Sequence, residues 1–147
     1  YLNGADVSER IRQNDVSMGA SAIAAIPAVR LKLVDMQRRL AEKHSVIMDG
    51  RDIGTYVLPD AELKIYLTAS VEERTKRRYE QLLQKGMECD IKKIKEDIKQ
   101  RDYNDMHREF APLKKAEDAV VVDSSDMTLD ETVDKIFKMI KEKQDVL

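Results

Sequence analysis

Short apolar runs between charged and turn-forming segments predict the β-strands of this chain. Three such runs stand out, at residues 46–48, 63–67 and 119–123. Runs of this length are typical of strands buried on both faces of a sheet. Long stretches with helical periodicity separate the second run from the third, and parallel strands need crossovers of that kind. The pattern therefore predicts an α/β fold with a parallel sheet.

Helical periodicity predicts five helices. The first covers residues 13–25 and is rich in small side chains, and Pro27 opens a second that runs to about residue 43. Start signals precede the other three, as capping boxes or a capping aspartate: Ser70 with Glu73, Asp90, and Thr128 with Glu131. Gly86 can end the third helix, and Pro112 lies beyond the fourth. In the last helix an apolar stripe is expected to face the core: Leu129, Val133, Ile136, Phe137 and Ile140.

The first residues predict a hairpin turn with almost no strand before it. Asn3-Gly4 is a strong two-residue turn signal, yet only Tyr1 and Leu2 precede it. The sequence does not open with Met, and three strands make a thin sheet for an α/β domain. We therefore expect these residues to be part of a longer protein.

Charged residues follow the first apolar run directly. Asp49, Arg51 and Asp52 surround Gly50 where the strand should end. In open α/β sheets, ligands bind just beyond the carboxyl ends of the strands. The group is therefore either part of a ligand site or a polar exit from the strand whose charges pair with each other.

The helix after Asp90 carries charge on the line that should face inward. This line begins with isoleucines at positions 91, 94 and 98, and the same steps of three and four lead on to Arg101, Asp105 and Arg108. Charges on an inward line either reach past the core or line a polar cavity. The alternative is a self-paired structural triad.

A second arginine group lies on the helix after Ser70, where Arg74, Arg77 and Arg78 follow helical spacing. Arginine forks match phosphate oxygens bidentately. The plainer interpretation is a solvated face, with Glu73 pairing to Arg77 four residues on. Two arginine groups together favour a polyanionic substrate such as a nucleotide, because phosphoryl transfer depends on positioning and charge neutralisation.

Composition limits the remaining function classes. The 147 residues carry a formal net charge of -2 and 5% aromatic residues, which disfavours a dedicated nucleic-acid binder. Cys89 is the single cysteine, so no disulfide forms within the chain, and a reducing cytoplasmic location is expected. No apolar run has membrane-spanning length, so no membrane association is expected.

A series of motifs then identifies a family, and they occur in this order: Asp-Gly-Arg-Asp-Ile-Gly-Thr at 49–55, Pro-Asp-Ala at 59–61, Lys-Ile-Tyr-Leu-Thr-Ala-Ser at 64–70, Glu-Glu-Arg at 72–74, Arg-Arg at 77–78, Ile-Lys-Gln-Arg-Asp at 98–102 and Ala-Pro-Leu at 111–113. Together they closely resemble the bacterial cytidylate kinases, which are P-loop nucleoside monophosphate kinases. The resemblance implies a three-layer fold with a parallel sheet, here incomplete because the N-terminal P-loop strand and helix are absent. Residues 1–147 would be the C-terminal part of one domain, with 1–12 ending the nucleoside-binding insertion and 70–109 containing the lid.

The resemblance also implies roles for individual residues. Three match the positions that recognise the cytosine base: Ser21, Arg30 and Asp52. Two match those that hold the ribose, Arg101 and Asp105, and two match arginines that grip the CMP phosphate, Arg51 and Arg108. Three arginines resemble those of the mobile lid that closes over the ATP phosphates: Arg74, Arg77 and Arg78. Asp49 resembles a Walker-B-type carboxylate near Mg²⁺. The implied reaction transfers the γ-phosphoryl group of ATP to CMP or dCMP, with Mg²⁺ bridging phosphates, in a monomeric enzyme.

One part of the family pattern is missing. A P-loop requires G-x-x-x-x-G-K-[ST], and no pair among the five glycines has that spacing. We therefore expect the 147 residues alone to be inactive. The alternatives are a related small-molecule kinase on the same fold and a non-catalytic nucleotide-binding module. The residues matched to base recognition distinguish a cytidylate kinase from the first alternative, since a kinase for another acceptor would not need them.

Overall fold

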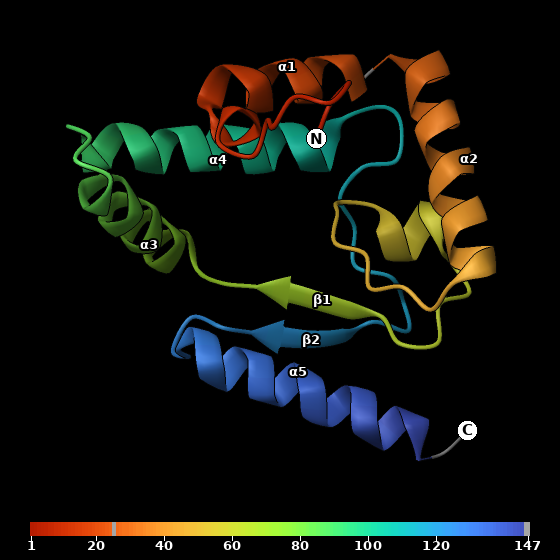
Figure 1. The fold of residues 1–147 in the computed structure, drawn as a ribbon. Helices are drawn as coiled ribbons and strands as arrows, with labels where there is room; N and C mark the ends of the chain where they lie inside the picture. The colour runs from red at the N-terminus through yellow and green to blue at the C-terminus, as the bar shows by residue number, and fades with distance from the viewer. Residues whose placement is uncertain (25, 146–147) are drawn as a thin grey trace. The chain divides into compact units, whose positions relative to one another are not determined.

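The structure is a computed structural model that describes residues 1–24 and 26–145, apart from the side chains of Arg12, Asn14, Asp15, Ser17, Met18 and Ser21. The chain forms two compact units, residues 1–48 and 49–147. Figure 1 shows the elements of each unit as a ribbon.

The unit of residues 1–48 is helical. It opens with a tight turn in which Leu2 and Ala5 exchange two backbone hydrogen bonds, with N···O distances of 2.8 and 3.0 Å. Asn3 and Gly4 have φ values of 50° and 83°, which confirms the predicted two-residue turn. The elements that follow are a 3₁₀ turn, η1 (Arg10–Arg12), and two helices, α1 (Asn14–Ala24) and α2 (Pro27–Lys43).

The prediction of a strand at residues 46–48 is wrong. These residues belong to no strand, and Ile47 is 91% exposed. A strand exists only where a neighbour completes its hydrogen-bond ladder, and among the described residues no strand pairs with this segment. Local hydrophobicity alone therefore did not determine its conformation.

The unit of residues 49–147 contains a pair of parallel strands. β1 (Ile65–Thr68) pairs with β2 (Val120–Asp123) in the register that places Ile65 opposite Val120 and Thr68 opposite Asp123. The crossover between the strands holds two helices, α3 (Val71–Gln84) and α4 (Ile91–His107), which pack against each other (Figure 1). The parallel α/β fold is thus as predicted, and Val122 at 0% exposure marks its core.

The helix ends of this unit follow their local sequence signals. Gly86, at φ 70°, ends α3 with two Schellman-type bonds, from its own N–H to the Leu83 carbonyl and from the Met87 N–H to that of Leu82. Asp90 caps α4 through the Lys92 N–H. The Thr128–Glu131 capping box is complete and begins α5 (Leu129–Gln144).

Two sequence expectations about these helices need correction. Ser70 accepts a hydrogen bond from the Glu73 N–H, but the Glu73 carboxylate binds Arg77 rather than completing the capping box. The stripe predicted to face the core in α5 is largely exposed, at 78% for Leu129 and 53% for Phe137. The buried position of α5 is Thr132, at 9%, and of the predicted stripe only Ile136 and Ile140 are half-buried, so the covered face is turned from the predicted one.

None of the helices in the described residues combines the length and the apolar character that crossing a membrane requires.

Candidate functional site

A turn of π-helix holds the loop that carries Arg51 and Asp52. This turn, η2 (Ile53–Val57), begins after Asp52, whose backbone carbonyl accepts hydrogen bonds from the N–H groups of Tyr56 (2.8 Å) and Val57 (3.1 Å). Val57 is 1% exposed and therefore anchors the turn in the core. π-helical turns are rare overall, and many of those that occur lie at functional sites. Here the two hydrogen bonds and the buried Val57 side chain fix the backbone next to Arg51 and Asp52.

Two ion pairs join this loop to the end of α4. Arg51 Nε lies 2.8 Å from Asp105 Oδ2, across 54 positions of sequence. Arg108 Nη2 lies 3.8 Å from Asp52 Oδ1, and Arg101 Nε lies 3.9 Å from the Asp105 oxygen that Arg51 binds. We call these five residues the arginine cluster.

The cluster rules out two self-paired arrangements that the sequence left open. The charges of residues 49–52 do not only pair among themselves, because Arg51 binds Asp105 on α4. The line Arg101–Asp105–Arg108 is not a closed triad either, since the short contact of Asp105 is with Arg51. Asp105 and Arg108 are 18% and 31% exposed, whereas Arg101 is 66% exposed and reaches past the core.

The arginines of the cluster are contacted through their Nε side. Arg51 and Arg101 have their Nε atoms toward Asp105, and Arg108 Nε donates to the Ala111 carbonyl at 2.8 Å. Among the described residues, no hydrogen bond is made by the Nη groups of Arg51 and Arg101 or by Nη1 of Arg108. Three guanidinium groups face two carboxylates, which leaves one net positive charge. The arrangement therefore offers oriented N–H donors to an anion.

Arg74 is engaged in a different way. Its Nη1 and Nη2 donate to both carboxylate oxygens of Asp102, at 3.0 and 2.7 Å, and its Nε donates to the Ala69 carbonyl at 3.0 Å. The hydrogen bond to Asp102 raises the pKa of the Arg74 guanidinium. This bidentate pair ties α3 to α4, and it uses all three nitrogens of the side chain.

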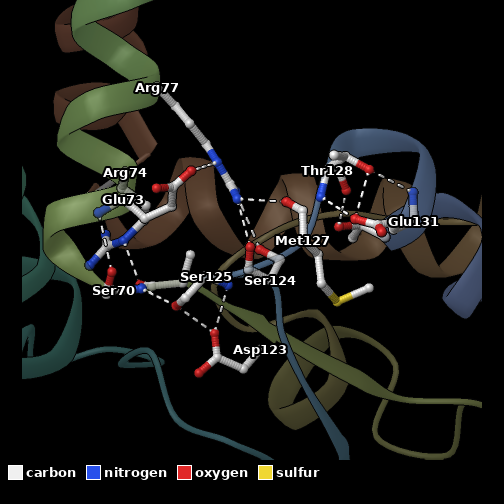
Figure 2. A network of polar contacts seen from close by, with 12 residues as sticks. Ser70, Glu73, Arg74, Arg77, Asp123, Ser124, Ser125, Met127, Thr128 and Glu131 are labelled. Atoms are coloured by element: carbon white, nitrogen blue, oxygen red, sulfur yellow. Dashed lines mark hydrogen bonds and ion pairs between the residues drawn. The ribbon is translucent and has the colours of Figure 1, made fainter.

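Arg77 is also fully engaged, as Figure 2 shows. Its Nε donates to Glu73 Oε1 at 2.8 Å, its Nη1 to Ser124 Oγ at 3.3 Å, and its Nη2 to the Ser124 and Met127 carbonyls at 2.6 and 3.1 Å. It therefore connects α3 to the loop between β2 and α5. Arg78 differs, because its one hydrogen bond within the described part of the chain runs from Nη1 to Gln81.

Hydroxyl groups join the carboxyl ends of the two strands. Ser124 donates from N and Oγ to the Thr68 carbonyl at 2.8 and 3.1 Å. The Ser70 N–H donates to Ser125 Oγ, whose own proton goes to Asp123 Oδ1 at 2.6 Å (Figure 2). The hydrogen bonds from the Ser125 hydroxyl and N–H lower the pKa of Asp123.

Sequence reasoning missed several of these residues. Ser124 and Ser125 follow β2 directly, so the rule that ligand sites lie beyond strand ends would have found them. Asp102 lies one position from the predicted inward line of α4, and nothing local marks it as the partner of Arg74. Ala111 has no signal at all for its positive φ of 47°.

The residues matched to base recognition divide between the two units. Ser21 lies in α1, with its side chain outside the described part, and Arg30 is half-buried on α2, both in the unit of residues 1–48. Asp52 belongs to the other unit and is 4% exposed. Their joint role stays a prediction.

Asp49 has the chemistry for a shared magnesium ion. It is exposed at the start of the loop before η2. Among the described residues no group of three or more histidine, cysteine or acidic side chains could hold a metal ion. Mg²⁺ usually keeps several waters and takes one or two protein carboxylates together with substrate phosphates. Asp49 fits that mode as a single carboxylate ligand.

Comparison with known proteins places the chain in a family. The family profile described as cytidylate kinase matches residues 1–142. The cytidylate kinase of Caldicellulosiruptor saccharolyticus is 57% identical over 138 residues, which is 94% of this chain and 61% of that protein. The cytidylate kinase of Lactobacillus johnsonii is 52% identical over 144 residues, which is 98% of this chain and 63% of that protein. The chain thus spans about three-fifths of the length of these curated relatives. It belongs to the cytidylate kinase family.

Proposed function

We propose that this chain supplies the acceptor side of a nucleoside monophosphate kinase. In the full-length protein, that kinase transfers the γ-phosphoryl group of ATP to CMP or dCMP. The observation that carries the proposal is the arginine cluster, whose guanidinium groups have their Nε atoms toward protein acceptors. The Nη groups of Arg51 and Arg101 and Nη1 of Arg108 lack hydrogen-bond partners among the described residues. A phosphate monoester accepts such paired N–H donors bidentately.

Within the cluster the roles divide by position. Arg51 and Arg108 bind the phosphate of the acceptor, as the family resemblance implies, and an ion pair to the opposite segment holds each of them in place. Arg101 and Asp105 hold the ribose, where the Asp105 carboxylate accepts hydrogen bonds from hydroxyl groups. Asp52 contributes to the selection of cytosine, and for Ser21 and Arg30, which belong to the other unit, the same role stays a prediction from the family resemblance.

The chemistry is mostly positioning and charge neutralisation. Phosphoryl transfer has a loose transition state whose negative charge is spread over the phosphoryl oxygens. Preorganised guanidinium groups stabilise that charge without reorganising during the reaction. Asp49 would be the protein ligand of Mg²⁺, which would supply further neutralisation of phosphate charge. No side chain has to act as a nucleophile.

The donor side draws on residues outside this chain. No G-x-x-x-x-G-K-[ST] motif occurs in the 147 residues, so the cradle for the ATP phosphates lies elsewhere in the full-length protein, and the isolated chain is inactive. Arg74, Arg77 and Arg78 form the lid over ATP. Arg78 is ready for this role, whereas the other two would first have to exchange their present partners.

Calorimetric titration of the full-length protein with CMP, UMP and AMP tests the proposal. CMP binds most tightly, and Arg108→Ala weakens CMP about 30-fold or more, because it removes charge-assisted hydrogen bonds of about 2 kcal/mol or more. The matched control is Arg39→Ala, since Arg39 is 68% exposed and its one ion pair within the described residues is with Asp35 on its own helix.

Two outcomes would contradict the proposal. Equal affinities for the three nucleotides would favour a kinase for another acceptor. Tight CMP binding without turnover in a coupled ATP assay of the full-length protein would favour a non-catalytic nucleotide-binding module.

A further inference from the structure

We infer that Ala111 is a positioning residue that fixes the Arg108 guanidinium for the acceptor phosphate. The inference rests on the proposed function for the role of Arg108. It concerns the backbone carbonyl of Ala111, three residues beyond Arg108, and a backbone conformation of Ala111 that the sequence does not predict.

The contact is a two-pronged hydrogen bond. Arg108 Nε donates to the Ala111 carbonyl at 2.8 Å, and Arg108 Nη2 donates to the same oxygen. Two donors on one acceptor fix the plane of the guanidinium as well as its place. Nη1 stays without a hydrogen bond among the described residues, and Nη2 lies 3.8 Å from the Asp52 carboxylate. The carbonyl therefore sets which edge of Arg108 is available to a ligand.

The Ala111 backbone is held in an unfavourable conformation. Its φ of 47° lies in the left-handed region, where a residue with a Cβ costs roughly 1–2 kcal/mol. Pro112 follows, and a residue before proline prefers extended backbone with negative φ. Such conformations persist only where surrounding structure determines them, and they cluster at active sites.

The surrounding structure supplies that determination. The Leu113 N–H donates to the Asp105 carbonyl at 2.7 Å, which satisfies a carbonyl of the last helical turn and folds the chain back onto α4. On the other side of Ala111, the Phe110 ring meets the Tyr56 ring edge to face, with centroids 5.0 Å apart. Residues 108–113 are thus fastened both to α4 and to η2.

These contacts allow an alanine at position 111 to adopt a positive φ. Glycine would adopt the positive φ at no steric cost, but it would also leave the segment more conformations in which the carbonyl misses Arg108. Alanine restricts those alternatives. The expected consequence is a small loss of stability together with a guanidinium that is already oriented before CMP binds.

The test is Ala111→Gly in the full-length protein, with CMP affinity and thermal unfolding measured together. Tm stays equal or rises by up to about 3 °C, because relief of the positive φ offsets the greater chain entropy of glycine. The Kd for CMP rises about five- to tenfold, since part of the orientation of Arg108 must now be restored on binding. A purely structural role moves Tm alone.

A matched control is Ala41→Gly. Ala41 lies near the end of α2 and has no assigned part in CMP binding. The substitution introduces the same conformational freedom of glycine at a helical position, so it should lower Tm slightly and leave CMP affinity unchanged.

A double-mutant cycle with Arg108→Lys tests whether the effect runs through Arg108. Lysine lacks the Nε–H donor, so Ala111→Gly should add less than about twofold in that background. The Nε–H resonance of Arg108, observed by ¹⁵N NMR without ligand, should exchange faster in Ala111→Gly.

Unchanged Arg108 exchange together with an unchanged CMP Kd in Ala111→Gly would overturn the inference. So would an equal loss of affinity in both backgrounds of the cycle. Failure of the proposed function has a different signature, because the unmodified full-length protein would then not bind CMP at all, while the exchange measurement would still report on the contact.

Discussion

Arg77 and Arg78 are neighbours on α3 that should respond to truncation in opposite ways. Arg77→Ala removes a side chain whose hydrogen bonds reach Glu73, the Ser124 hydroxyl and carbonyl, and the Met127 carbonyl. Arg78→Ala removes one hydrogen bond to the exposed Gln81. The two substitutions delete the same atoms from the same helix, so each controls for the other.

The expected cost follows from the contacts. Arg77 is 41% exposed, so water can replace part of what its guanidinium supplies. Its pair with Glu73 is an i,i+4 surface pair and contributes about 0.3–0.5 kcal/mol. The bonds to Ser124 count for more, because that residue is 4% exposed and its carbonyl would lose a charged donor. The sum is about 2 kcal/mol, which corresponds to a fall in Tm of about 4–8 °C.

Thermal unfolding of the full-length protein measures this difference, and hydrogen exchange at residues 124–127 locates it. Arg78→Ala should change Tm by less than about 2 °C, as surface substitutions usually do, while raising the KM for ATP. Equal Tm values for the two variants, with equal protection at residues 124–127, would refute the reasoning. Arg77 would then be as available to a ligand as Arg78.

Three further predictions concern the same unit. Asp102→Asn breaks the bidentate pair with Arg74, in which the Asp102 carboxylate raises the pKa of the guanidinium. The substitution should lower the free energy of unfolding by about 1 kcal/mol, measured with denaturant. Ser125→Ala removes the main hydrogen bond that lowers the pKa of Asp123. The stability that this lowered pKa supports is present above the unfolded pKa of about 3.9 and is lost as pH falls through the lower folded pKa. The difference in unfolding free energy between the variant and the parent protein should therefore shrink between about pH 5 and pH 2. Gly86→Ala places a side chain at φ 70° and should lower stability by about 1 kcal/mol in the same unfolding assay.

The parts of the fold that sequence predicted are those set by local chemistry. Asn3-Gly4, Asp90 and the Thr128–Glu131 box each fix a turn or a helix end through hydrogen bonds within a few residues. The strand predicted at residues 46–48 was wrong because a strand depends on a neighbouring strand from elsewhere in the sequence. The prediction of the buried face of α5 was wrong for a related reason, since the face that a helix buries depends on the surface it packs against.

The candidate site was predictable to a similar extent. The step from isoleucines to Arg101, Asp105 and Arg108 along α4 indicates the correct element from the sequence alone. The partner of Asp105 was not predictable, because Arg51 lies 54 positions away and is brought to α4 by a π-helical turn without a sequence signature. Ala111 was beyond prediction altogether, since alanine before proline is expected to be extended.

The two arginine groups, which look alike as sequence, differ in how many of their nitrogen atoms are already used. A guanidinium has donors on three nitrogens, and a ligand can only recruit those that folding leaves without a partner. Arg51 uses Nε to bind Asp105, and that single bond orients the side chain while leaving its Nη groups available. Arg77 uses all three nitrogens, two of them on the oxygens of a buried serine, so releasing it would strip a buried carbonyl of its donor. Donor occupancy therefore supports the proposed phosphate binding by the arginine cluster. On the same ground Arg78, which would give up only its hydrogen bond to Gln81, is a better candidate than Arg77 for the proposed contact with ATP.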